Sequence, residues 1–101
     1  MYTFEVLSKS NDFLCGEIEL YCGKSINNKI AVANVVTPFD SPNLLQASAI
    51  IVEKGGILNH ISIFSREFGI TCIKLENATK ILKTGQKVKL DLEKKQLIIT
   101  D

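Results

Sequence analysis

The apolar residues of this chain fall into short runs, and their period changes from that of strands to that of a helix directly after Gly55-Gly56. Before the glycines, residues 17–21 alternate polar and apolar side chains, which is typical of a strand buried on one face. Residues 29–36 and 48–53 are more continuously apolar and are predicted to be inner strands. We therefore expect a sheet that forms from the first half of the chain and a main helix that follows the glycines.

This main helix is predicted to begin at Asn59, because asparagine is a favoured N-cap residue, and His60 then falls in the first turn. The side chains that share one face at helical spacing are Ile61, Phe64, Ser65 and Phe68. Gly69 follows as a C-terminal stop, since glycine readily adopts the left-handed conformation that ends helices.

The remaining elements are predicted to be short. Residues 71–75 form a strand, and residues 78–83 form a minor helix that Asn77 caps and Gly85 ends. Residues 87–92 and 96–99 pair as a hairpin. Two prolines within residues 37–42 predict a loop. The expected fold class is α/β in three layers (β/β/α), with mixed strands, one main helix and one short helix, in a single domain over residues 1–101.

Composition and charge exclude several classes of protein. With 46% hydrophobic and 23% charged residues, the chain is neither disordered nor collagen-like. A net charge of +1 provides no basic footprint for nucleic acid and no polybasic anchor for a membrane. No apolar run reaches the roughly 18 residues of a membrane span, and the N-terminus lacks the pattern of a signal peptide. We expect a cytoplasmic protein.

The three cysteines, Cys15, Cys22 and Cys72, are too few and of the wrong parity for a disulfide framework. A zinc site of these cysteines with His60 satisfies the ligand count, but its ligands would come from distant segments. We interpret the cysteines as reduced, mostly buried thiols and expect no metal site. A small enzyme with Cys15 or Cys72 as nucleophile beside His60 is a further hypothesis, although no sequence feature indicates a lowered thiol pKa.

The feature that points to chemistry is the double glycine followed by His60 at the opening of a helix. Gly55 and Gly56 lack a Cβ atom, so the backbone there can turn sharply and approach a ligand closely. A helix N-terminus offers N–H donors and the positive end of a dipole, which together bind anions such as phosphate. An imidazole near pH 7 can be neutral and nucleophilic. His60 is therefore a candidate phosphoryl acceptor, and the alternative interpretation is a polar surface residue.

A longer set of residues extends this pattern over about two thirds of the chain. Its members are Thr37-Pro38, Ala49-Ile50-Ile51-Val52-Glu53-Lys54-Gly55-Gly56, Leu58-Asn59-His60, Ser62-Ile63, Ser65-Arg66-Glu67-Phe68-Gly69-Ile70, Ala78-Thr79, Leu82 and Gly85-Gln86-Lys87-Val88. Together they resemble the mobile phosphohistidine (swivelling) domain of the phosphoenolpyruvate-utilising enzymes, such as phosphoenolpyruvate synthase, pyruvate phosphate dikinase and rifampin phosphotransferase. The most specific part is the double glycine with a histidine four residues later.

The resemblance implies that His60 carries the phosphoryl group, through Nε2, and that the whole domain swivels between two distant sites. It also implies that Gly55 and Gly56 form the tight loop before the histidine, with Asn59 and Ser62 as supporting residues. One partner domain is then expected to bind ATP or an acceptor and another phosphoenolpyruvate, in cis or in trans. Mg²⁺ and ATP or phosphoenolpyruvate are expected at these partner domains, and no cofactor is expected on this chain.

Three residues around the histidine depart from the family pattern. Leu58 cannot hydrogen-bond the imidazole, Asn59 stands in place of Ser or Thr, and Ile61 stands in place of a small residue. Asn59 still suits the N-cap position. The departures leave open a second hypothesis, a binding or scaffold module that keeps the fold without phosphotransfer. Arg66 and Glu67 match the family, and either a docking role or a solvated helix face explains them.

Overall fold

The computed structural model describes residues 1–55 and 59–100. Its strands are β1 (Tyr2–Thr3), β2 (Glu5–Ser8), β3 (Phe13–Leu20), β4 (Ile30–Ala33), β5 (Ala49–Val52), β6 (Thr71–Lys74), β7 (Lys87–Asp91) and β8 (Gln96–Ile99). Its helical segments are the 3₁₀ helix η1 (Pro38–Asp40) and the α-helices α1 (Ser41–Leu44), α2 (His60–Phe68) and α3 (Ala78–Ile81). None of the helices in these two ranges is long and apolar enough to cross a membrane.

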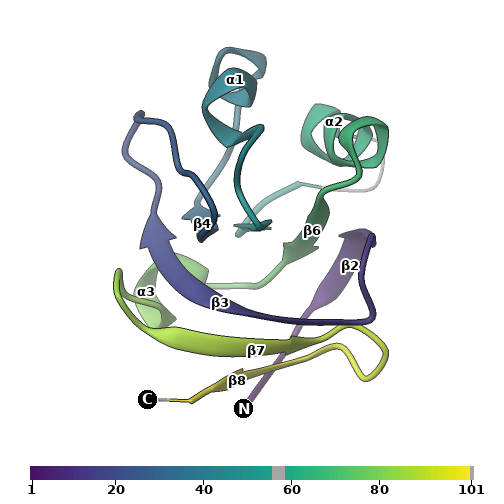
Figure 1. Cartoon of the computed structure of the whole chain (residues 1–101), viewed down its shortest axis with the longest axis vertical. Helices are drawn as coiled ribbons and strands as arrows, with labels where there is room; N and C mark the ends of the chain where they lie inside the picture. The colour runs from purple at the N-terminus through teal and green to yellow at the C-terminus, as the bar shows by residue number, and fades with distance from the viewer. Residues whose placement is uncertain (56–58, 101) are drawn as a thin grey trace.

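Strand β3 joins two halves of the sheet, in which the strands are ordered β1-β8-β7-β3-β4-β5-β6-β2. In one half β3, β4, β5 and β6 run parallel, with Ile30 opposite Ala49 and Ala49 opposite Thr71, and β2 pairs antiparallel with β6. In the other half β7 pairs antiparallel with both β3 and β8. Figure 1 shows β7 and β8 below β4 and β6, so the two halves face each other.

Buried side chains fill two cores, one on each face of β5. Ala49 and Ile51 belong to the core between the two halves of the sheet, whereas Ile50 and Val52 belong to the core beneath α1 and α2. Because side chains alternate along a strand, β5 has to be apolar at every position to fill both cores. The layers therefore follow the order sheet, sheet, helices (Figure 1), and the predicted β/β/α arrangement is confirmed.

The strands differ from the predicted ones mainly at their ends. Residues 48–53 shorten to β5, and residues 29–36 shorten to β4, because Val35 lies exposed beyond the strand. Residues 17–21 belong to the longer β3, which begins at Phe13. Strands β1 and β2 have no counterpart among the predicted elements. Both are short edge strands, whose few residues carry little periodic signal.

The loop predicted over residues 37–42 is wrong, because η1 and α1 occupy this segment. Proline is compatible with the first turn of a helix, where its missing N–H needs no partner. Pro38 begins η1, and Pro42 lies in the first turn of α1. Thr37 precedes η1 and donates its N–H to Asp40 Oδ2 at 2.9 Å.

Helix α3 ends at Ile81, two residues before the predicted end at residue 83. Asn77 occupies its N-cap position with φ of 62°, but the Asn77 side chain makes no capping hydrogen bond, which corrects the predicted role. Glu53, at the end of β5, caps the helix instead: its carboxylate accepts hydrogen bonds from Thr79 N, at 2.9 Å, and from the Thr79 hydroxyl. Gly85 does not end the helix and lies before β7 with φ of 97°.

Candidate functional site

Helix α2 presents His60 at its first position, and Asn59 caps this end of the helix. Asn59 has extended backbone angles, and its Oδ1 accepts a hydrogen bond from Ile61 N at 3.1 Å. The Asn59 carbonyl accepts from Ser62 N and Ile63 N, at 3.0 and 3.2 Å. These bonds occupy the N–H groups of residues 61–63, so these groups are not available as donors to an anion. The helix dipole would then be the main contribution of α2 to binding an anion near His60.

The imidazole of His60 is half-buried. Nε2 is shielded from solvent and has no hydrogen-bond partner among the residues that the structure describes. A buried nitrogen without a partner is uncommon, because desolvation of a polar atom is unfavourable. The resemblance assigns the phosphoryl group to this nitrogen, so the ring has to turn or its surroundings have to open before Nε2 meets a donor.

Gly55 has a backbone conformation that glycine alone adopts readily, with φ of 140°. A Cβ atom at this position would lie 3.7 Å from Asn59 Cγ, which is an ordinary van der Waals distance. The glycine is therefore required by the backbone angle and not by crowding. Gly56 and Leu58, which the sequence analysis also names, lie outside the described residues.

The other predicted residues of α2 differ in their surroundings. Ser62, which the resemblance names as a supporting residue, is fully buried. Arg66 donates from Nη1 to the Leu7 carbonyl of β2 at 3.3 Å, which ties the helix to the edge of the sheet. Glu67 is exposed. The sequence analysis offers a docking role or a solvated helix face for Arg66 and Glu67. For Arg66, the structure shows a local contact with Leu7.

Asp40, at the end of η1, is a residue near the site that the sequence analysis does not single out. Its Oδ1 accepts from the Tyr21 hydroxyl at 2.7 Å, and its Oδ2 accepts from Thr37 N and Thr37 Oγ1. The pKa of Asp40 lies below its ordinary value, mainly because Thr37 N–H and the Tyr21 hydroxyl stabilise the carboxylate, and the charge of His60 adds to this effect. The one available signal is Thr37-Pro38, which belongs to the resemblance.

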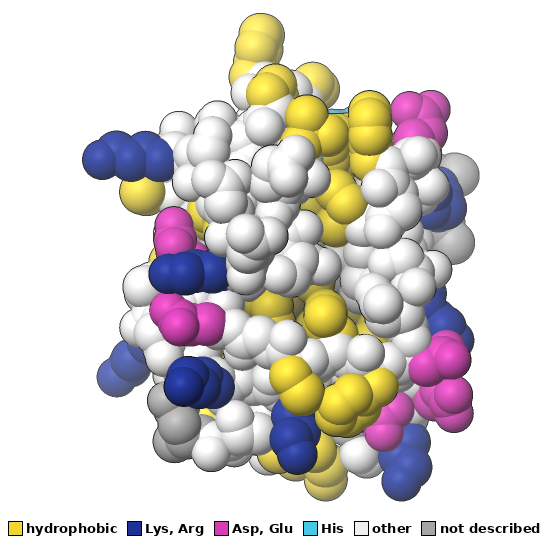
Figure 2. Space-filling view, viewed as in Figure 1, with side chains coloured by type: hydrophobic (Ala, Val, Ile, Leu, Met, Phe, Trp, Pro, Cys, Tyr) yellow, Lys and Arg dark blue, Asp and Glu magenta, His cyan; other side chains and the backbone are white. Residues whose placement is uncertain are grey.

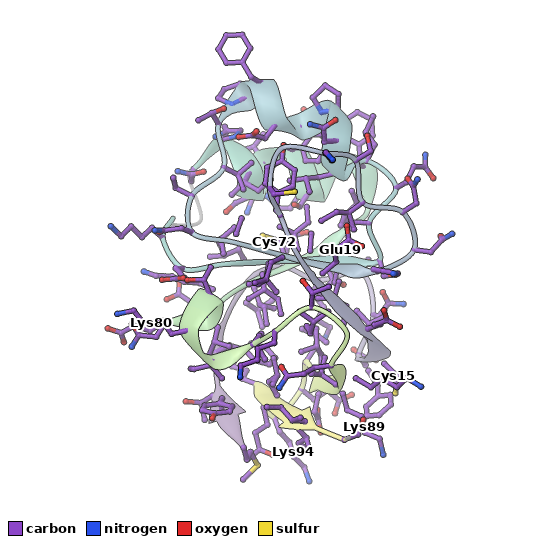
Figure 3. The ribbon with its side chains drawn as sticks, turned by 90° about the vertical axis from the view of Figure 1, so that its left-hand side faces the viewer. Cys15, Glu19, Cys72, Lys80, Lys89 and Lys94 are labelled. Carbon is purple, nitrogen blue, oxygen red and sulfur yellow. The ribbon has the colours of Figure 1, made fainter. Side chains whose placement is uncertain are left out.

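The cysteines do not gather around His60. Cys72, in β6, is buried, and burial raises the pKa of its thiol to about 12, so it is no nucleophile near neutral pH. Cys15 and Cys22 are exposed, which corrects the expectation of mostly buried thiols. Figure 3 shows Cys72 near the centre of the molecule and Cys15 at its periphery. Within residues 1–55 and 59–100, no three His, Cys, Asp or Glu side chains form a group that could hold a metal ion.

A cavity of about 430 Å³ lies next to Gly55, where β5 and β6 end. Its lining residues are Glu53, Lys54, Gly55, Lys74, Glu76 and Asn77. Two lysines and two glutamates give it no dominant charge. His60 does not line this cavity, so the cavity and the histidine are separate features.

His60 lies at the capped N-terminus of α2. Comparison with known proteins shows which family has a matching sequence. The family described as "PEP-utilising enzyme, mobile domain" matches residues 26–95, which include α2 and Asp40. The chain belongs to this family. The mobile domain is 43% identical over 63 residues to the probable phosphoenolpyruvate synthase of Methanothermobacter thermautotrophicus, and these residues are 61% of this chain and 9% of that protein.

A second relative is also a long protein of which the matched residues are only a small part. The rifampicin phosphotransferase of Bacillus cereus is 31% identical over 62 residues, which are 60% of this mobile domain and 7% of that protein. The chain therefore spans less than a tenth of the length of these relatives.

Solved structures confirm the fold of the mobile domain. A structure of Enzyme I superimposes with a TM-score of 0.63 and 22% identity, over 77% of this chain and 33% of that one. The structure of aconitase X of Thermococcus kodakaraensis superimposes with a TM-score of 0.71 and 16% identity, over 99% of this chain and 98% of that one. At these identities the two likenesses concern the fold alone.

Proposed function

We propose that this mobile domain is a phosphoryl carrier in which His60 is transiently phosphorylated. The domain would move the phosphoryl group between a nucleotide- or acceptor-binding domain and a site for phosphoenolpyruvate, pyruvate or another substrate, in cis or in trans. The observation that carries the proposal is the position of the chain's single histidine, in the first turn of α2 and inside the family match.

In the proposed transfer, the lone pair of Nε2 attacks the phosphorus of the donor. The N–P bond forms as the P–O bond of the donor breaks, and the leaving oxygen keeps the bonding electron pair. Transfer onward reverses this exchange, and Nε2 recovers its lone pair. The positive end of the α2 dipole stabilises the negative phosphoryl oxygens while they reside on His60.

The partner domains complete the reaction in this proposal. Mg²⁺ together with ATP or phosphoenolpyruvate would bind there, and this chain contributes the nucleophile and its mobility. The family relatives support partners in cis, because the mobile domain is a small fraction of their length. A cytoplasmic location belongs to the same proposal, since such phosphoryl donors are intracellular metabolites.

Labelling of His60 tests the proposal. The chain is incubated with Mg²⁺, ³²P-labelled phosphoenolpyruvate and a phosphoenolpyruvate synthase from which the mobile domain has been removed. We expect a label that is lost in mild acid and survives base, as a phosphoramidate does, and that is absent in His60→Gln, since an amide is no nucleophile. Thermal unfolding of His60→Gln verifies that the variant is folded.

The buried position of Nε2 adds an observation in favour of the scaffold hypothesis, which the departures around the histidine leave open. An unlabelled chain, an acid-stable label, or a label that persists in His60→Gln would contradict the carrier function and leave the scaffold as the better explanation.

A further inference from the structure

A group of polar side chains lies where the end of β3 meets η1 and α1, and we call Tyr21, Thr37, Asp40 and Asn43 the Asp40 cluster. The Asp40 carboxylate is its centre, held by the Tyr21 hydroxyl at 2.7 Å, by Thr37 N at 2.9 Å and by Thr37 Oγ1 at 3.0 Å. Asn43 Nδ2 donates to the Tyr21 hydroxyl at 3.0 Å and to the Gly23 carbonyl at 3.2 Å. These bonds fix the carboxylate in position without any cationic partner of its own in the cluster.

The Asp40 cluster and the beginning of α2 border the same buried core. Val36 and Leu44, which flank the cluster in sequence, share one buried core with Ile61, the residue after His60. Tyr21 packs against the same core. Figure 1 shows α1 and α2 next to each other in the helical layer. The charge of His60 lowers the pKa of Asp40, as expected for a cation close to a carboxylate.

We propose that Asp40 is a positioning residue for His60, whose fixed carboxylate stabilises the positive charge that the imidazole gains while a phosphoryl group enters or leaves. This inference rests on the proposed carrier function and adds a residue to it. Three hydrogen bonds from Thr37 and Tyr21 already occupy the carboxylate. Asp40 therefore acts on the ring through its charge and not as a proton acceptor.

The charge of the imidazole ring explains why a nearby carboxylate accelerates both the phosphorylation of His60 and the loss of the phosphoryl group. When Nε2 bonds to phosphorus, Nδ1 keeps its proton, and the ring is positively charged until that proton is released. The protonated ring is also the better leaving group when the N–P bond breaks. In each direction the ring carries positive charge in the transition state, so one negative charge nearby accelerates both.

The Asp40 carboxylate is negatively charged near neutral pH. The pKa of Asp40 lies below its ordinary value, so the carboxylate is ionised. Partial burial raises the pKa of Tyr21, so its hydroxyl remains a donor to Asp40. The exposed Cys22 thiol, which follows Tyr21, is a further titratable group that acts on that tyrosine.

Phosphoramidate tests the inference without any partner domain. This small donor phosphorylates imidazole: the N–P bond to His60 forms, the P–N bond of the donor breaks, and ammonia leaves. ³¹P NMR follows the rate of labelling and, after the donor is removed, the rate of loss. We expect Asp40→Asn to slow both rates about three- to tenfold, the size expected for one charge acting across partly solvated protein.

Tyr21→Phe is the matched control, because it removes a hydrogen bond from the Asp40 cluster but leaves the carboxylate charged. We expect it to destabilise the protein while changing both rates by less than about twofold.

The outcomes separate the inference from the proposed function. Equal slowing in both variants overturns the inference and makes the cluster a structural element. If the unchanged chain takes no label at His60 from phosphoramidate or from the donor enzyme, the carrier function fails, and the role of Asp40 fails with it. A labelled parent chain with an unaffected Asp40→Asn variant rejects the inference alone.

Discussion

At Gly55 the backbone holds a φ of 140°, which residues with a side chain rarely adopt. We expect Gly55→Ala to lower the free energy of unfolding by about 1–3 kcal/mol, the usual cost of forcing a side chain into such a conformation. Urea denaturation measures this difference. Because a Cβ atom would find ordinary contact distances at this position, an unchanged midpoint would show that the backbone angle carries no constraint.

Asn59 connects stability to the proposed transfer, since its side chain caps the helix that begins with His60. Asn59→Ala should cost about 1 kcal/mol through the lost cap, whereas Asn59→Ser keeps an acceptor and should cost little. We also expect Asn59→Ala to slow labelling of His60, measured with the donor enzyme.

A comparison variant for Asn59→Ala lies in the last hairpin, far along the chain from His60. Asp91 Oδ1 accepts from Glu93 N and Lys94 N at 3.1 and 3.0 Å, so Asp91→Ala loses a comparable set of backbone contacts. Equal effects of Asn59→Ala and Asp91→Ala on labelling would contradict a specific role for the helix N-terminus.

The parts of the site that sequence could predict are the local ones. Asn59 as N-cap and His60 in the first turn follow from residues that are adjacent in the chain. The approach of Asp40 depends on how α1 packs on the core that Ile61 shares, and no local pattern encodes that packing. The burial of Nε2 depends on a side-chain conformation, which sequence does not specify either.

Among the elements, α3 is unusual because a residue from another element caps it. The pKa of Glu53 lies below its ordinary value, chiefly because the Thr79 hydroxyl donates to the carboxylate. A lowered pKa means that the charged form favours folding above the ordinary carboxyl range, and this stability is lost as the pH falls through the lowered value.

We therefore expect Glu53→Gln to destabilise the protein most near neutral pH. The difference from the unchanged chain should shrink as the pH falls below about 4, where the carboxylate takes up its proton. Thermal unfolding between neutral and acidic pH measures this. A difference that stays constant over that range would mean that the charge of Glu53 does not contribute.

The elements that sequence could predict are those with a strong hydrophobic pattern. Strand β5 and the β7–β8 hairpin lie close to their predicted bounds because their side chains fill the cores. Helix α1 was beyond such a prediction, since prolines that open a helix and prolines that prevent one look alike in sequence. The cap of α3 could not be predicted from the sequence either, because Glu53 lies far from Thr79 in the chain and on a different element.

Over the whole molecule, exposed hydrophobic side chains lie in the helical layer and also at the opposite end, where Met1 and Ile98 are exposed. Figure 2 shows yellow side chains at the top, the end at which Figure 1 places α1 and α2. Phe39, beside Asp40, is 92% exposed, and Ile63 of α2 is 45% exposed. Such side chains on a surface that also carries the candidate nucleophile suit contact with a donor domain.

We expect Phe39→Ser to slow labelling by the donor enzyme and to leave labelling by phosphoramidate unchanged. The free energy of unfolding should change by less than about 0.5 kcal/mol, because an exposed side chain contributes little to the fold. Phe13→Ser is the control, since Phe13 is 55% exposed at the beginning of β3, outside the helical layer. Similar slowing in both variants would argue against docking through this face.

The pairing of β1 with β8, with Tyr2 opposite Leu97, holds both ends of the chain at the sheet side of the molecule, away from α1 and α2 (Figure 1). The longest dimension, 32 Å, runs from these ends to the helical layer. Under the proposed carrier function, a rotation of the whole domain about this sheet side would move His60 by a distance comparable to the length of the molecule, and neither core would have to repack.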